Sequence, residues 1–129
     1  AVADWRVAGS RYTKLKKQDR DMAEPIQLSL CENPDILASI AQSDQRPKLV
    51  IGFAAETEDL QENAVAKRQR KQCDWIIANQ VGGKADPVFG SDMNHIMLIA
   101  ETAVENWPRM LKTELADRLA ERIAEELSK

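Results

Sequence analysis

The segment spanning residues 50–81 constrains the fold most, because it has the pattern of a strand, a helix and a second strand. Residues 49–55 form a continuous apolar run, and residues 75–78 form another. Apolar runs without alternation are typical of strands covered on both faces, as in parallel sheets. Between them, residues 59–72 begin with acidic and end with basic side chains, which favours a helix. This order indicates a right-handed parallel crossover and predicts an α/β fold with a mostly parallel sheet flanked by helices.

The ends of these two strands are the expected place for a ligand. In open α/β sheets, ligands bind beyond the carboxyl ends of parallel strands. The first strand runs into Gly-Phe-Ala-Ala-Glu-Thr at residues 52–57, and the second stops at Asn79. Small residues there let a ligand approach the backbone, and Phe53 is able to stack on a base or ring. A tightly packed core Phe explains the same residues equally well.

A basic cluster closes the predicted helix, and it includes Lys67 and Lys71. These two lysines are four residues apart and therefore share one helix face. Two ammonium groups on one face favour an anion with several charges, such as a triphosphate. Basic residues in the last turn also complement the helix dipole, so this purely structural interpretation stays open.

Residues 6–24 are rich in charged and polar side chains and contain little to bury. We interpret them as a long mobile loop, of the kind that often forms a lid. Lys14 lies in this loop, where a lysine can close over a phosphate during turnover. A solvated run of charges is the alternative interpretation.

The rest of the chain supplies further elements of an α/β fold. Residues 26–30 alternate with period two, as in a half-buried strand. Asn33 is a favoured N-cap, Pro34 fits a first helical position and Asp35 suits the positive end of a helix dipole, so a helix is expected to about Ser43. Two more strands are expected at residues 93–100 and 103–107, and a long amphipathic helix at residues 110–127.

Composition narrows the functional classes. The 129 residues suit one domain, and the net charge of −3 argues against a nucleic-acid binder. The apolar runs are too short to span a membrane, and the first residues lack the pattern of a signal peptide, so we expect a cytoplasmic protein. Cys31, Cys73 and the single His95 have no metal-ligand spacing, which argues against structural zinc. We expect both thiols to be buried and reduced.

Taken together, the segments resemble the carboxyl-terminal part of bacterial phosphopantothenoylcysteine synthetase. The resemblance covers almost the whole chain, residues 1–129, and agrees in order and approximate spacing. It is carried by Ala-Val-Ala-Asp-Trp-Arg at 1–6, Lys-Leu-Lys-Lys at 14–17, Asn-Pro-Asp-Ile-Leu at 33–37, Gly-Phe-Ala-Ala-Glu-Thr at 52–57, the basic residues 67–71, Asp74, Ala-Asn at 78–79 and Gly-Ser-Asp-Met-Asn at 90–94.

The resemblance implies the second half of a Rossmann-like ligase domain of coenzyme A biosynthesis. That family joins 4′-phosphopantothenate to L-cysteine, using CTP and a divalent cation, usually Mg²⁺. The substrate carboxylate is first activated as an acyl-cytidylate with release of pyrophosphate, and the cysteine amine then displaces CMP.

The resemblance also implies roles for particular residues. Asp4 would lie at the nucleotide site, and Lys14 would sit on a lid that closes over the intermediate. Lys67 and Lys71 would bind the triphosphate. Phe53 would pack on the nucleotide, and a helix start would lie beside it at Pro34, Asp35, Ile36 and Leu37. Metal ligands are not implied for any residue, and Gln80 stands where the family usually has Asp.

Family members have further parts that these residues do not supply. One is a first half of the domain, with a glycine-rich segment and an Asn linked to conversion of the acyl-cytidylate. Another is a flavin-dependent decarboxylase, to which bacterial members are often fused. We therefore expect this chain alone to be inactive and, from the resemblance, to belong to a homodimer. The alternative is a catalytically inactive α/β domain that binds a nucleotide or another polyanion.

Overall fold

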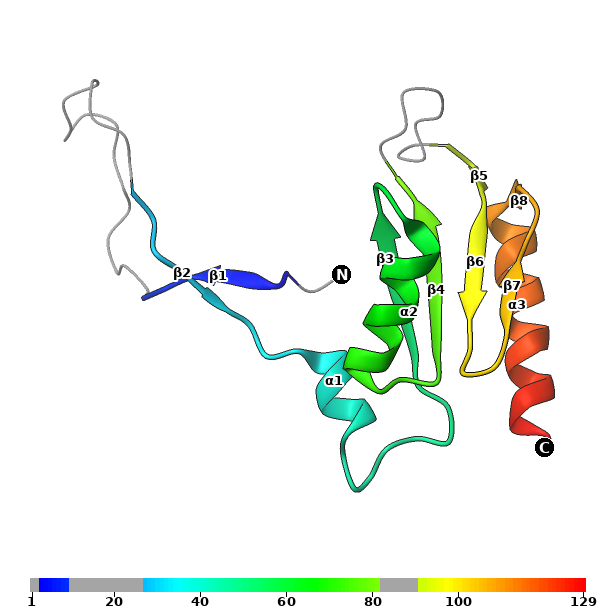
Figure 1. Ribbon diagram of the computed structural model, residues 1–129, viewed down its shortest axis with the longest axis horizontal. Helices are drawn as coiled ribbons and strands as arrows, with labels where there is room; N and C mark the ends of the chain where they lie inside the picture. The colour runs from blue at the N-terminus through cyan, green and yellow to red at the C-terminus, as the bar shows by residue number, and fades with distance from the viewer. Residues whose placement is uncertain (1–2, 10–26, 82–90) are drawn as a thin grey trace. The chain divides into compact units, whose positions relative to one another are not determined.

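A computed structural model describes residues 3–9, 27–81 and 91–129, which form two compact units, Ala1–Asp35 and Ile36–Lys129 (Figure 1). The predicted lid residue Lys14 and the predicted loop at residues 82–87 lie outside the described residues.

The first unit contains a two-stranded antiparallel ribbon. Strand β1 (Trp5–Val7) pairs with β2 (Leu30–Glu32), and Val7 lies opposite Leu30. Arg6 and Val7 therefore lie in a strand rather than in the predicted loop. Of the strand expected at residues 26–30, Leu30 lies in β2, and residues 27–29 precede it outside any strand. Long-range pairing sets these limits, which local alternation does not reveal. Just beyond the ladder, the amide of Asn33 donates to the carbonyl of Asp4 at 2.8 Å.

The main sheet of the second unit has the order β3-β4-β6-β7. Strands β3 (Ile51–Glu56) and β4 (Trp75–Gln80) are parallel and are joined by helix α2 (Leu60–Lys71), which confirms the predicted strand–helix–strand unit. Strands β6 (Ile96–Ile99) and β7 (Val104–Asn106) are antiparallel to their neighbours.

The α/β class is thus confirmed, whereas the described sheet is mixed rather than mostly parallel. Both β4–β6 and β6–β7 are antiparallel pairs, and the second follows from its connection. The amide of Ala100 donates to the carbonyl of Ala103 at 2.9 Å and closes a short turn. A turn of this length can join only antiparallel strands.

Both faces of β4 are covered, as its continuous apolar run predicts, whereas Phe53 and Ala55 leave one face of β3 exposed. On one face, Ile76 and Ala78 of β4 enter a core that also contains Ala64 of α2. On the other face, Trp75 and Ile77 enter a core packed against helix α3 (Lys112–Leu127). Alternate residues of one strand therefore belong to different cores, because successive side chains point to opposite faces.

The strand expected at residues 93–100 is divided in two. Strand β5 (Met93–Asn94) pairs with β8 (Met110–Leu111) in a small separate sheet, and only β6 joins the main sheet. Helix α3 consequently begins at Lys112, two residues later than predicted. The carboxylate of Glu114 accepts a hydrogen bond from the amide of Leu111 at 3.0 Å and closes its first turn.

Helix α1 (Ile36–Ala41) is shorter than its sequence signals predict. Asn33, the expected N-cap, directs its side-chain amide to the carbonyl of Ala3 at 2.6 Å, while its side-chain oxygen accepts from Arg6 at 3.0 Å. Because these bonds use the Asn33 side chain within the first unit, it stabilises the turn after β2.

Candidate functional site

The carboxyl ends of β3 and β4 lie side by side, as the sequence predicts. Glu56 pairs in register with Gln80, and the amide of Val81 donates to the carbonyl of Glu56 at 2.9 Å. The side-chain amide of Gln80 also donates to the carbonyl of Thr57 at 3.3 Å. In Figure 1, α2 starts from this edge and runs back along the strands.

Lys67 reaches toward this edge from α2. Its Nζ lies 3.7 Å from Oε1 of Glu56, and the two side chains are 28% and 23% exposed. Lys71 is one helical turn further along α2, at the end that leads into β4. The two lysines share a helix face as predicted, and Lys67 contacts a residue of the carboxyl edge.

Phe53 is 68% exposed, so it is not a core residue. It lies on the opposite face of β3 from α2. Ala54 belongs to the core beneath α2, whereas Ile51 packs against the core beneath α3. Phe53 is two residues after Ile51, so its side chain points to the same face of the strand as that of Ile51. The structure therefore does not bring Phe53 together with Lys67. An exposed ring on a sheet remains available to pack against a ligand.

The other residues implied by the resemblance are divided between the two units. Asp4, Pro34 and Asp35 belong to the first unit and are exposed. Ile36 and Leu37 begin α1 in the second unit. Ile36 is 50% exposed, whereas Leu37 packs against the core beneath α2. Helix α1 also contacts α2, so these two residues and Lys67 belong to elements on the same side of the sheet.

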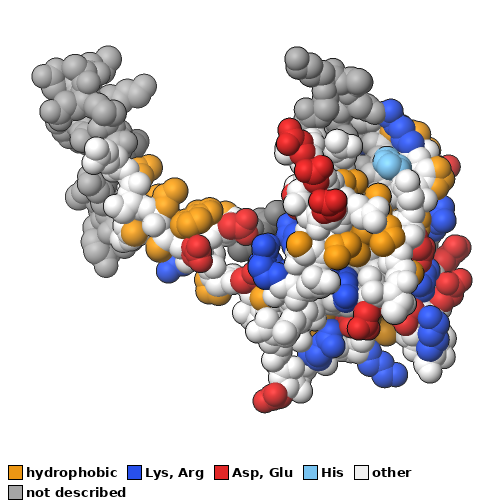
Figure 2. Space-filling model, in the orientation of Figure 1, with side chains coloured by type: hydrophobic (Ala, Val, Ile, Leu, Met, Phe, Trp, Pro, Cys, Tyr) orange, Lys and Arg blue, Asp and Glu red, His pale blue; other side chains and the backbone are white. Residues whose placement is uncertain are grey.

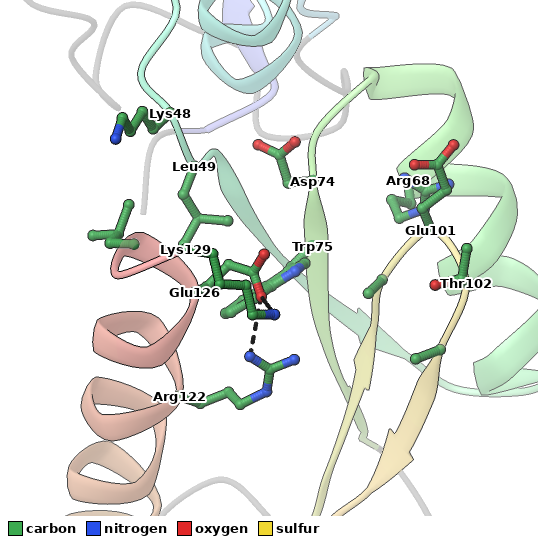
Figure 3. A pocket seen from close by; sticks show the side chains of 13 residues that line it. Lys48, Leu49, Arg68, Asp74, Trp75, Glu101, Thr102, Arg122, Glu126 and Lys129 are labelled. Atoms are coloured by element: carbon green, nitrogen blue, oxygen red, sulfur yellow. Dashed lines mark hydrogen bonds and ion pairs between the residues drawn. The ribbon is translucent and has the colours of Figure 1, made fainter.

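A cavity of about 560 Å³ lies at the opposite edge, where β3 and β4 begin (Figure 3). It contains none of the residues predicted for the site. The lining is mostly polar and comes from the strand starts, α2, the β6–β7 turn and the end of α3: Lys48, Leu49, Arg68, Asp74, Trp75, Ala100, Glu101, Thr102, Ala103, Arg122, Glu126, Leu127 and Lys129.

Arg122 in this cavity is held by several partners. Its guanidinium donates to Glu105 at 3.1 Å and to Glu126 at 3.2 Å, and it lies 4.9 Å from the ring centre of Trp75. Burial opposes ionisation of Glu105. Hydrogen bonds from Trp107 and Arg122, with the nearby arginine charges, outweigh burial and lower the pKa of Glu105. This network attaches α3 to the sheet.

Asp74 fixes the starts of the two parallel strands. Its Oδ2 accepts a hydrogen bond from the amide of Val50 at 2.7 Å and from the guanidinium of Arg46 at 2.7 Å. In the sequence, Asp74 stands out only as part of the resemblance. Its position directly before an apolar strand is the signal that could have identified this structural role.

The cysteines and the surface add further constraints. Both cysteines are free thiols. Cys73 is buried as predicted, whereas Cys31 is only half-buried in the ribbon. Burial raises the pKa of the Cys73 thiol.

On the face drawn in Figure 2, acidic and basic side chains are interspersed over the second unit.

Neither a metal cluster nor a membrane span is found in the part of the chain that the structure describes. Within residues 3–9, 27–81 and 91–129, no group of three or more His, Cys, Asp and Glu side chains could hold a metal ion. Across the same residues, no helix is long and apolar enough to cross a membrane.

Comparison with known proteins identifies the family. Residues 1–127 match the family model described as DNA/pantothenate metabolism flavoprotein C-terminal domain. Among solved structures, the C-terminal domain of a coenzyme A biosynthesis bifunctional protein CoaBC has a TM-score of 0.62 and 26% identity, covering 78% of this chain and 45% of that one. A Streptococcus pneumoniae DNA/pantothenate metabolism flavoprotein has a TM-score of 0.65 at 20% identity, over 98% of this chain and 57% of that one, and supports the fold.

Two curated relatives cover nearly the whole chain, and both are named coenzyme A biosynthesis bifunctional protein CoaBC. The one from Haemophilus influenzae is 34% identical over 129 residues, and the one from Escherichia coli K12 is 38% identical over 124 residues. These matches cover 100% and 95% of this chain but only 31% and 30% of the relatives. The chain therefore belongs to the DNA/pantothenate metabolism flavoprotein C-terminal domain family, as its resemblance to the carboxyl-terminal part of the synthetase predicts.

Proposed function

We propose that this chain is part of a CTP-dependent ligase of coenzyme A biosynthesis that joins 4′-phosphopantothenate to L-cysteine. Its family and the names of its relatives support the pathway. The structural observation that carries the proposal is Lys67, which is partly buried and reaches the carboxyl edge of β3. A cation at that edge suits an anionic ligand, because ligands bind at the carboxyl ends of parallel strands.

The proposed reaction has two steps. A carboxylate oxygen of 4′-phosphopantothenate attacks the α-phosphorus of CTP, and pyrophosphate leaves as the acyl-cytidylate forms. The amine of cysteine then attacks the acyl carbon, loses a proton and expels CMP. Neither step requires a nucleophile from the protein, so the enzyme acts by positioning the reactants and stabilising charge.

The proposed roles follow the resemblance. Lys67 and Lys71 bind the triphosphate, and Lys14 closes over the phosphates during turnover. Asp4 and Phe53 contact the nucleotide, as do the residues around the start of α1, at positions 34–37. For Mg²⁺, we propose entry with the nucleotide, since Mg²⁺ in phosphoryl-transfer sites is held largely by substrate phosphates and water.

A pyrophosphate-release assay tests the reaction. The full-length gene product is incubated with 4′-phosphopantothenate and CTP, with and without L-cysteine, and with ATP in a parallel series. We expect pyrophosphate release with CTP, faster turnover when cysteine is added and a large loss in Lys67→Ala. No pyrophosphate under any of these conditions would reject the ligase.

The alternative is an α/β domain that binds a nucleotide or another polyanion without turnover. The ion pair between Lys67 and Glu56 favours this alternative, because Glu56 partly neutralises the positive charge that the ligase would need at Lys67. Calorimetry with CTP distinguishes the two functions. Binding that depends on Lys67, without pyrophosphate release, would support the alternative.

We also propose a homodimer, as the resemblance implies. Trp5, Val7 and Leu30 lie on one face of the ribbon and are 54%, 49% and 55% exposed. A two-stranded ribbon is marginally stable by itself and gains stability when an apolar face is covered. Light scattering of the full-length gene product tests the proposal, with Trp5→Ser and Val7→Ser expected to shift the mass toward the monomer.

A further inference from the structure

Gly52 lies where helix α1 packs against strand β3. A side-chain carbon added to Gly52 would collide with Cδ2 of Leu37 and would lie 2.8 Å from Cδ1 of Ile76. Real contacts of this kind are essentially never so short, so one neighbour would have to move. The absence of a side chain at Gly52 is therefore what allows Leu37 to lie against the sheet.

The two neighbours differ in their ability to move. Ile76 is fully buried in β4 and pairs in register with Gly52. Close packing around such a residue leaves it no room. Leu37 is only partly buried and belongs to α1, a helix of six residues. A methyl group at Gly52 would therefore displace Leu37.

Leu37 and Ile36 are consecutive at the start of α1, so a shift of this end of the helix would carry Ile36 with it. Ile36 is an aliphatic side chain with 50% exposure, so it has apolar surface to offer a ligand. We propose that Gly52 is a positioning residue, which seats Leu37 and so sets the place of the Ile36 side chain against the nucleotide. This inference rests on the proposed function, in which these residues lie beside CTP.

Steady-state kinetics of the full-length gene product test the inference. We expect Gly52→Ala to raise KM for CTP about fivefold with kcat nearly unchanged, because overpacking shifts the neighbours of the added group. In a Leu37→Ala background the collision is absent, so adding Gly52→Ala should change KM by less than about twofold. Ile76→Val is the matched control. It removes a methyl from the other neighbour and should lower the unfolding midpoint without changing KM.

Several outcomes would overturn the inference while leaving the ligase intact. One is an unchanged KM in Gly52→Ala when Lys67→Ala still impairs CTP use. Another is an equal rise in KM with and without Leu37. If pyrophosphate is never released, the proposed function fails, and methyl NMR then decides whether Gly52 seats Leu37. Unmoved Leu37 methyl signals in Gly52→Ala would overturn the inference by themselves.

Discussion

Replacing Asp74 with alanine should destabilise the second unit by about 2–3 kcal/mol. The main cost is the hydrogen bond from the partly buried amide of Val50, which is 2.7 Å long and has a carboxylate acceptor. Hydrogen bonds to charged groups contribute about 1.5–3 kcal/mol. The ion pair with Arg46 adds about 0–1 kcal/mol, because the two side chains are 38% and 31% exposed and solvent screens the pair.

Urea unfolding followed by tryptophan fluorescence measures this loss, since Trp75 and Trp107 are 4% and 1% exposed and report on the core. By thermal unfolding, the midpoint should fall by about 6–15 °C. Arg46→Ala removes the ion pair alone and should cost less than about 1 kcal/mol. Asp74→Asn keeps an acceptor without the charge and should lie between the two. Equal losses in Asp74→Ala and Arg46→Ala would refute the reasoning, because the Val50 hydrogen bond would then contribute nothing.

Three further predictions concern Glu105, the two cysteines and Glu56. The pKa of Glu105 is lowered from 4.5, so its stabilisation is complete above about pH 4.5 and is lost as the pH falls through the lowered pKa; urea midpoints should therefore depend less on acid pH in Glu105→Gln than in the wild type. Burial raises the pKa of Cys73, so a thiol reagent should modify Cys31 quickly and Cys73 only on unfolding, and rapid reaction of both would contradict this. Glu56→Gln should lower KM for CTP by up to about fivefold, because it frees Lys67 and removes a negative charge, and a higher KM would show that Glu56 holds Lys67 in its binding position.

Local sequence signals predicted the strand–helix–strand unit well because its elements satisfy their own requirements. The apolar run of β4 is covered on both faces, and the charges of α2 suit its dipole. The limits of β2, β5 and α3 were predicted less well. Their ends depend on partners far along the chain, such as Val7 for Leu30 and Asn94 for Met110.

The candidate site was predictable only in part for a similar reason. Spacing correctly placed Lys67 and Lys71 on one face of a helix. It could not show that Glu56 pairs with Lys67, or that Phe53 lies on the other face of β3, because both depend on how the elements pack. The cavity at the opposite edge had no sequence signal, since its lining comes from five separated segments.

The two faces of β4 differ in size as well as in their neighbours. Toward α2 the core contains Ala54, Ala64 and Ala78 beside aliphatic side chains such as Ile76, whereas toward α3 it contains the indoles of Trp75 and Trp107. A slip of one residue in β4 would exchange the faces and drive the indole ring of Trp75 into a core of alanine and aliphatic side chains. The difference in side-chain size therefore fixes the register of β4 in the sheet. Insertion or deletion of a single residue within β4 should consequently be far more damaging than most substitutions there.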